Sequence, residues 1–195
     1  MSVVHTKAER KFIPHRFFLS ASEHFIAMAN HKHNGYYYEW LGAIILSALS
    51  IEAVGNSYGK VLIPNWRDLI SERIKDKRGA SPRLKLELVA QRCGVAPDFT
   101  THPWLTIQKL THFRDSVAHA TRDSLEVERE CTETDFGWVL TAALKADMET
   151  MITEEFARQS CDAVTQIISS LNKTLKPSEL HELTYDGNES YAKMV

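Results

Sequence analysis

The chain has 195 residues, of which 44% are hydrophobic and 25% are charged, and its net charge at neutral pH is −2. These values are typical of one soluble globular domain with a substantial core. The near-neutral charge excludes a protein that attracts nucleic acid through a strong overall positive field. Three scattered cysteines (Cys93, Cys131 and Cys161) exclude a disulfide framework and a cysteine-based zinc site, and they suit a reducing cytoplasm.

The hydrophobic periodicity predicts helices throughout and no alternating strands. We expect residues 1–15 to be poorly ordered, residues 16–176 to form one helical domain, and residues 177–195 to be a polar tail. The predicted helices run from Phe17 or Ser20 to His33, from Tyr36 to about Val61, from Arg67 to Ile74, from Ser81–Pro82 to Gly94, from Pro103 to Ala120, and from about Thr134 to Leu175 with a break near Thr153. The predicted fold class is all-α, an up-and-down bundle with additional short helices.

No membrane span or signal peptide is expected. The N-terminal segment has no apolar signal-peptide core, and the longest uncharged apolar-rich run, from Trp40 to Ile51, falls short of the roughly 20 residues that a spanning helix needs. The expected location is therefore the cytoplasm.

The second predicted helix carries a carboxylate on its apolar stripe. Leu41, Ile45 and Ala48 follow helical spacing, and Glu52 falls on the same stripe one turn later. A carboxylate there requires a charged or hydrogen-bonding partner. Glu52 could orient a functional side chain on another helix, form a structural ion pair, or lie where the stripe turns to solvent.

The most informative segment is Arg114-Asp115-Ser116-Val117-Ala118-His119, near the end of the fifth predicted helix. Arginine is a permanent cation that binds phosphate with a planar fork, and histidine transfers protons near neutral pH. Positions five apart point about 140° away from each other on a helix, so the pair converges only at a frayed helix end or across a dimer. Asp115 and His119 share a face, where the carboxylate could orient the imidazole. The alternative is a structural Asp–His pair with Arg114 in an ordinary ion pair.

This segment, following the helix that carries Ser50-Ile51-Glu52-Ala53, resembles the HEPN superfamily over roughly Tyr36 to Ala120. The signature of that family is an arginine, a polar residue, a few helical residues and a histidine. The resemblance implies a helical bundle that dimerises and, in many members, cuts RNA without a metal in toxin–antitoxin, phage-defence or RNA-processing systems. Arg114 would bind the scissile phosphate and His119 would act as general acid or base. Asp115 and Glu52 would orient the pair, and Ser116 would line the cleft.

Two departures bear on this interpretation. In some members of the family, the second residue after the motif histidine is a tyrosine that becomes modified. Here that residue is Thr121, so regulation through a modified tyrosine is not supported. Asp115 places a carboxylate beside the expected phosphate site, where it could weaken RNA binding. A non-catalytic module therefore remains an alternative interpretation.

A basic segment precedes the motif. Residues 71–92 contain seven cations and three anions, whereas residues 123–155 contain ten carboxylates and two cations. Both segments could be solvated surfaces. The functional alternatives are complementary patches between protomers or a basic rim that binds RNA, for which the candidates are Arg73, Lys75, Lys77 and Arg78.

Other candidate chemistry is weaker. His24, His31 and His33 lack acidic or cysteine partners at ligand spacing, so they are expected to be surface histidines, and we expect no metal or cofactor. The aromatic group Tyr36, Tyr37, Tyr38 and Trp40 could stack bases, but packing on a neighbouring helix is the favoured interpretation.

The preferred hypothesis is thus a homodimeric, metal-independent endoribonuclease that leaves a 2′,3′-cyclic phosphate, with RNA as substrate and an antitoxin or defence protein as a possible partner. The alternatives are a non-catalytic HEPN-like module that binds a protein, a nucleotide or RNA, and a helical scaffold without a nucleic-acid role.

Overall fold

The computed structural model describes residues 4–10, 12–31, 35–73, 81–119, 147–185 and 188–194. Eight helices lie within these ranges: α1 (Pro14–Ala29), α2 (Tyr36–Leu62), α3 (Trp66–Arg73), α4 (Pro82–Arg92), α5 (Trp104–Ala118), α7 (Asp147–Thr150), α8 (Glu154–Asn172) and α9 (Pro177–Thr184). The packed body of the described chain is entirely helical, which confirms the predicted all-α class.

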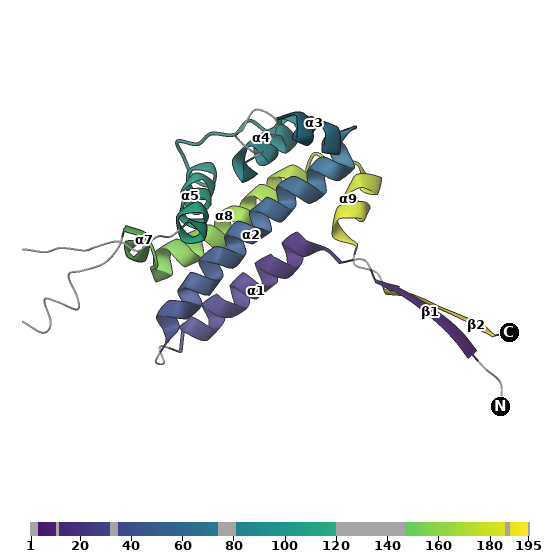
Figure 1. Ribbon diagram of the computed structural model, residues 1–195, viewed down its shortest axis with the longest axis horizontal. Coiled ribbons are helices and arrows are strands. Elements are labelled where there is room, and N and C mark those ends of the chain that lie inside the picture. The colour runs from purple at the N-terminus through teal and green to yellow at the C-terminus, as the bar shows by residue number, and fades with distance from the viewer. Residues whose placement is uncertain are drawn as a thin grey trace, which may run out of the picture.

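Helix α2 is the central element. It contacts α1, α4, α5, α8 and α9, and Figure 1 shows α1 and α8 running alongside it while α4 and α5 cover the other side. Its N-terminus begins at Gly35, whose φ of 108° is a left-handed conformation that glycine adopts without strain. The predicted bounds of this helix, Tyr36 to about Val61, are therefore confirmed within one residue.

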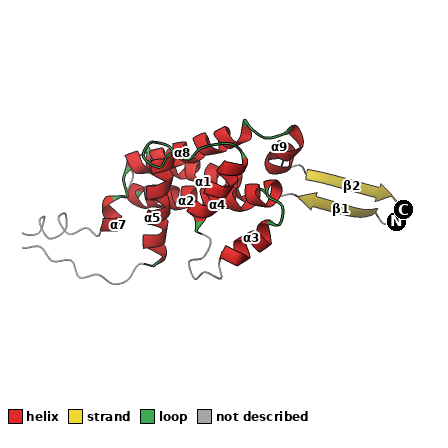
Figure 2. Cartoon of the chain, turned by 90° about the horizontal axis from the view of Figure 1, so that it is seen from above, coloured by secondary structure: helices red, strands yellow, loops and turns green. Residues whose placement is uncertain are grey.

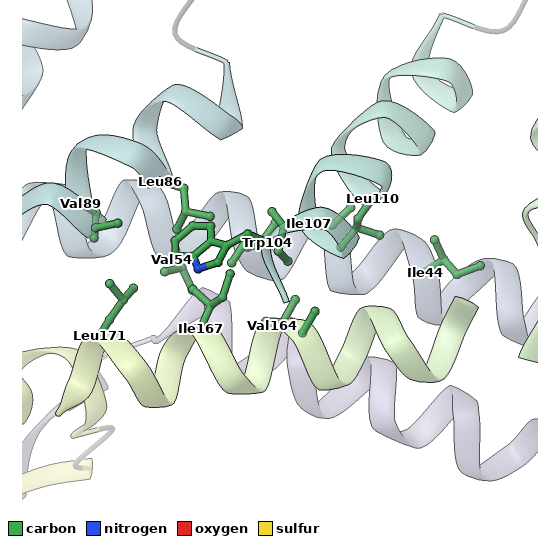
Figure 3. Packing of buried hydrophobic residues seen from close by; sticks show 14 of the residues in the cluster. Ile44, Val54, Leu86, Val89, Trp104, Ile107, Leu110, Val164, Ile167 and Leu171 are labelled. Atoms are coloured by element: carbon green, nitrogen blue, oxygen red, sulfur yellow. The ribbon is translucent and has the colours of Figure 1, made fainter. Parts of the chain in front are cut away.

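The core forms where four helices converge. Figure 3 shows side chains of α2, α4, α5 and α8 that belong to this one core: Ile44, Val54, Leu86, Val89, Trp104, Ile107, Leu110, Val164, Ile167 and Leu171. The buried face of α2 is rotated about the helix axis relative to the predicted apolar stripe. Ala48 is buried, but Leu41 and Ile45 are only half-buried, because Ile44, Ile51, Val54 and Tyr58 face the core instead. With neighbours on several sides, this helix buries more than one stripe.

Helices α1 and α2 approach closely through small and hydroxyl side chains. Ser22 Oγ donates to the Ala43 carbonyl at 2.9 Å and shares a 2.8 Å hydrogen bond with Ser47 Oγ. Ser50 Oγ donates to the His15 carbonyl at 2.7 Å. These bonds satisfy buried polar groups that would otherwise oppose burial.

Several predicted boundaries need correction. Helix α1 begins at Pro14, because proline suits the first helical turn, and it ends at Ala29 rather than His33. The break near Thr153 is confirmed, since Thr153 Oγ1 accepts from the backbone N–H of Phe156 and caps α8. The predicted helix start at Thr134 lies outside the described residues.

The terminal segments also differ from prediction. The expected disordered N-terminus contains strand β1 (Val4–Arg10), and the expected polar tail contains α9 and strand β2 (Asn188–Met194). Helix α8 ends at Asn172, and Pro177 opens α9, where Glu179 accepts a hydrogen bond from the Lys176 backbone N–H in a capping arrangement. The strands pair antiparallel, Val4 opposite Met194, and Figures 1 and 2 show this ribbon projecting from the helical body. Backbone pairing between distant segments leaves little trace in local sequence patterns.

A buried histidine links the stability of the bundle to pH. His15 is 1% exposed, and its ring packs edge-on against Tyr58 with 5.5 Å between centroids. Burial, with the nearby charge of Arg16, lowers the pKa of His15 from 6.5 to about 4. The folded protein therefore holds this imidazole neutral at pH values where the unfolded chain protonates it.

We expect this contribution to stability to be complete above about pH 6.5 and to be lost as the pH falls towards 4. Its full size is about 3 kcal/mol, because each pKa unit corresponds to about 1.4 kcal/mol. Urea unfolding of wild type and His15→Gln between pH 4 and 7 measures it: the variant should show the shallower decline. The exposed His24→Gln serves as control, and equal pH slopes for wild type and His15→Gln would contradict the assignment.

Candidate functional site

The motif helix α5 is anchored by its apolar face. Ile107, Leu110 and Phe113 are at most 1% exposed, and the Phe113 ring lies 6.2 Å from that of Phe156 on α8. Because Phe113 is fully buried, the next residue, Arg114, is fixed at the edge of the core beside α2. The predicted helix, Pro103 to Ala120, is confirmed as Trp104–Ala118.

Arg114 lies between two carboxylates. Its Nη2 donates to Glu52 Oε2 on α2 at 2.8 Å, and its Nη1 donates to Asp115 Oδ1 at 2.8 Å. The side chains of Arg114, Glu52 and Asp115 are 31%, 24% and 48% exposed. The expected contact between Glu52 and the motif helix is thus present, in the form of a partly buried ion pair; its role in catalysis stays a prediction.

His119 does not join this network. It is the C-cap of α5, with φ −113° and ψ 16°, and its backbone N–H donates to the Asp115 carbonyl at 3.0 Å. The side chain is exposed and makes no hydrogen bond to a described residue. Asp115 is directed to Arg114 rather than to His119, which differs from the predicted Asp–His pair because the permanent guanidinium charge is the stronger partner.

The electrostatics favour a firmly charged arginine. The hydrogen bond to Asp115 raises the pKa of Arg114 above its ordinary value, and the charge of Glu52 acts in the same direction against the opposing effect of burial. The three side chains together carry one net negative charge. A guanidinium has five N–H donors, so three remain beyond the two bonds described, and these could bind a phosphate oxygen.

The predicted RNA-binding residues are only partly described. Ser116 Oγ donates to the His112 carbonyl at 3.0 Å, a bond within the helix. Arg73 ends α3, and Lys75, Lys77 and Arg78 lie outside the described residues, as does most of the acidic segment. On α4, Arg83 pairs with Glu87 at 2.8 Å and lies over the Phe99 ring, 4.0 Å from its centroid. Arg83 is therefore engaged in structural contacts.

The aromatic cluster at the start of α2 packs partly on itself and partly on its neighbours: Tyr37 and Trp40 pack against the core, and the Tyr37 hydroxyl donates to the Glu149 carbonyl of α7 at 3.4 Å. The Tyr36 and Trp40 rings are 4.7 Å apart, and the Tyr37 and Tyr38 rings are 5.8 Å apart. Tyr38 is 72% exposed. Among the described residues no group of three histidine, cysteine or acidic side chains could hold a metal ion.

One polar network escaped the sequence analysis. His102 Nδ1 lies 3.0 Å from Thr106 Oγ1, and His102 Nε2 lies 3.0 Å from Asp162 Oδ2 on α8. Gln166 Nε2 donates to the same Asp162 oxygen at 2.8 Å. The network ties the start of α5 to α8. The four-residue spacings of His102–Thr106 and Asp162–Gln166 were visible in the sequence, but the contact between helices was not.

A double-mutant cycle tests the ion pair between α2 and α5. We expect Glu52→Gln and Arg114→Gln to lower the free energy of unfolding with a coupling of about 1 kcal/mol, because the pair is partly exposed and partly screened. The same cycle on RNA cleavage should show coupling if Glu52 orients Arg114 for catalysis. Glu52→Gln combined with Arg158→Gln is the matched control: Arg158 bonds Glu154 and Asn30, so additivity is expected. Additivity for Glu52 and Arg114 in both assays would remove Glu52 from the site.

Within the described part of the chain, α2 is the one helix long and apolar enough to cross a membrane, and 50% of its most apolar window is buried inside the fold. A core helix of a soluble protein has the same properties, so this is weak evidence for a span.

Comparisons with protein-family models, with curated proteins and with solved structures gave no match to this chain.

Proposed function

We propose that the chain is a HEPN-like, metal-independent endoribonuclease that acts as a homodimer in the cytoplasm, in a toxin–antitoxin or phage-defence setting. The observation that carries the proposal is the Arg114 guanidinium, fixed by carboxylates of two helices, on the helix that ends at an exposed histidine. A permanent cation and a titratable imidazole are sufficient for phosphodiester cleavage without a metal.

In this mechanism the RNA 2′-hydroxyl attacks the adjacent phosphorus. The 2′-hydroxyl loses its proton to a general base, the bond to the 5′-oxygen breaks, and a general acid protonates that leaving oxygen, which leaves a 2′,3′-cyclic phosphate. His119 serves in one of these proton transfers. Arg114 stabilises the charge that develops on the phosphate oxygens. Asp115 is the partner that the phosphate would displace, because it is the more exposed of the two carboxylates.

A dimer is part of the proposal because one chain does not bring the two groups together. Arg114 is held against α2, whereas His119 lies exposed at the C-cap. A two-fold axis near α5 would bring Arg114 of each protomer to His119 of the other, at two equivalent sites.

The second candidate is a non-catalytic HEPN-like module that binds a protein, a nucleotide or RNA. The observation in its favour is the net negative charge of the Arg114, Glu52 and Asp115 group, which opposes the approach of a scissile phosphate and therefore favours a module without catalysis at Arg114.

The test is cleavage of single-stranded RNA by the purified protein in chelator, with the product ends identified as 2′,3′-cyclic phosphates, together with sedimentation at micromolar concentration. Cleavage by a dimer supports the enzyme. RNA binding without cleavage supports the second candidate, and a monomer would count against a shared site.

A further inference from the structure

A cavity of about 880 Å³ lies at the end of the bundle where α2 finishes. Its walls come from the last two turns of α2, the turn at Pro64 and Asn65, α3, the end of α4 and the start of α9. Neither Arg114 nor His119 lines it, so it is separate from the candidate catalytic group. Its volume is within the range of about 300–1,000 Å³ that small-molecule sites occupy.

Trp66 gives this cavity a flat wall that is fixed in place. A Cβ atom on Gly59 would clash with Cε2 and Cζ2 of Trp66, so the indole ring lies directly on the backbone of α2. Trp66 nevertheless remains partly exposed and, with Ile63 and Ile70, forms the apolar lining. A ring held in this way presents a preformed surface for a planar apolar group, which lowers the entropic cost of binding.

Three cations stand at the rim of the same cavity: Lys60, Arg67 and Arg92. None of them forms an ion pair within the described ranges of the chain. The one lining carboxylate, Glu179, already accepts the Lys176 backbone N–H at 2.9 Å. The lining therefore carries an excess of two positive charges.

Two of these three cations are explained by a stabilising effect on their own helices, and the third is not. Lys60 and Arg92 lie in the last turns of α2 and α4, where a cation is favourable, and Arg92 Nε donates to the Leu62 carbonyl at 3.2 Å. Arg67 is different, because it lies in the first turn of α3, where a positive charge opposes the helix dipole. The bond to Leu62 also fixes the plane of the Arg92 guanidinium and leaves its two Nη groups to donate elsewhere.

We propose that this cavity binds a small planar aromatic molecule that carries a phosphate monoester. The phosphate, with a charge of about −1.5 to −2 at neutral pH, matches the excess of two positive charges. Arginine forks bind its oxygens in pairs, and the Trp66 ring covers the aromatic part. This proposal does not depend on RNA cleavage at Arg114.

The test measures the binding of 1-naphthyl phosphate to the full chain by isothermal titration calorimetry. We expect saturable binding of one molecule per chain. 1-Naphthol, which lacks the charge, and inorganic phosphate, which lacks the ring, should each bind at least about tenfold more weakly, since each lacks one of the two contacts. Absence of saturable binding, or equal affinity for either control probe, would overturn the proposal.

Matched variants locate the site. Arg67→Gln and Arg92→Gln should each weaken binding by about tenfold to a hundredfold, the range for loss of a charged hydrogen bond. Lys109→Gln removes the same charge from the exposed surface of α5, outside this cavity, and should leave the affinity unchanged. Arg67 is exposed, so its replacement should not disturb folding, which circular dichroism checks. An effect of Lys109→Gln equal to that of Arg67→Gln would indicate non-specific attraction and overturn the site.

A nuclear magnetic resonance measurement tests the aromatic wall separately. The indole N–H signal of Trp66 is identified by its loss in Trp66→Phe. We expect 1-naphthyl phosphate to shift this signal and to leave that of the buried Trp104 in place. A probe that binds without moving the Trp66 signal would refute the placement.

Discussion

Replacement of Arg114 by alanine is expected to lower RNA cleavage by about a hundredfold or more, and replacement of His119 to do the same. The first variant removes the cation that stabilises the phosphate, and the second removes a proton-transfer group. The measurement is the initial rate of single-stranded RNA cleavage in chelator. His112→Ala is the matched control, because His112 is an exposed histidine of the same helix. Wild-type cleavage in both variants would refute the assignment.

The same two variants test whether the site is shared between chains. Arg114 and His119 lie at different places on α5, so a composite site would take each group from a different protomer. We expect a mixture of Arg114→Ala and His119→Ala proteins to recover part of the wild-type activity after exchange of subunits, because some dimers then contain one intact site. No recovery, with exchange demonstrated by a label, would contradict a site composed in this way.

Phe113→Ala should cause the largest loss of stability among single changes near the motif. Phe113 is 0% exposed and packs against Phe156, so its truncation removes buried contacts and leaves a cavity. The expected cost is about 3–5 kcal/mol, measured as the change in the free energy of unfolding in urea. RNA cleavage should also fall, because the backbone of Arg114 loses its anchor.

Tyr38→Ala is the control for Phe113→Ala, since Tyr38 is 72% exposed and its loss should change stability by less than about 1 kcal/mol. Phe113→Leu should recover part of the loss by refilling the space. Similar costs for Phe113→Ala and Tyr38→Ala would show that α5 is not anchored through Phe113.

The helices before α9 were predictable because each carries local signals, whereas α9 lies in the segment expected to be a polar tail. Ser81 caps α4 by accepting from the Leu84 backbone N–H, and Pro82 occupies the first turn, as the sequence indicated. The terminal strands were not predictable, because their pairing joins residues at opposite ends of the chain and has no local signature. The angle of the α2 stripe was also missed, since the buried face of a helix with several neighbours depends on tertiary packing.

The sequence was sufficient to predict which residues belong to the candidate site, but not which of their side chains bond to one another. Spacing showed that Glu52 falls near the apolar stripe of α2 and that Arg114 and His119 diverge on α5. It could not show that Asp115 bonds to Arg114 rather than to His119, because that choice depends on side-chain rotamers. The cavity beside Trp66 was missed for a different reason: it is built from segments of four helices and one turn, and Gly59 gives no signal until the indole is seen against it.

The antiparallel pairing of Val4 with Met194 has a consequence for the order in which the chain folds. Helices α1 and α2 are consecutive and can dock as soon as both have formed, whereas β1 and β2 meet only when nearly the whole chain has closed into a loop. Closing that loop costs conformational entropy, and a pair of strands outside the core provides little stabilisation to offset this cost. The strand pair should therefore assemble last and open first, and its amide protons should exchange with solvent well before those of α2.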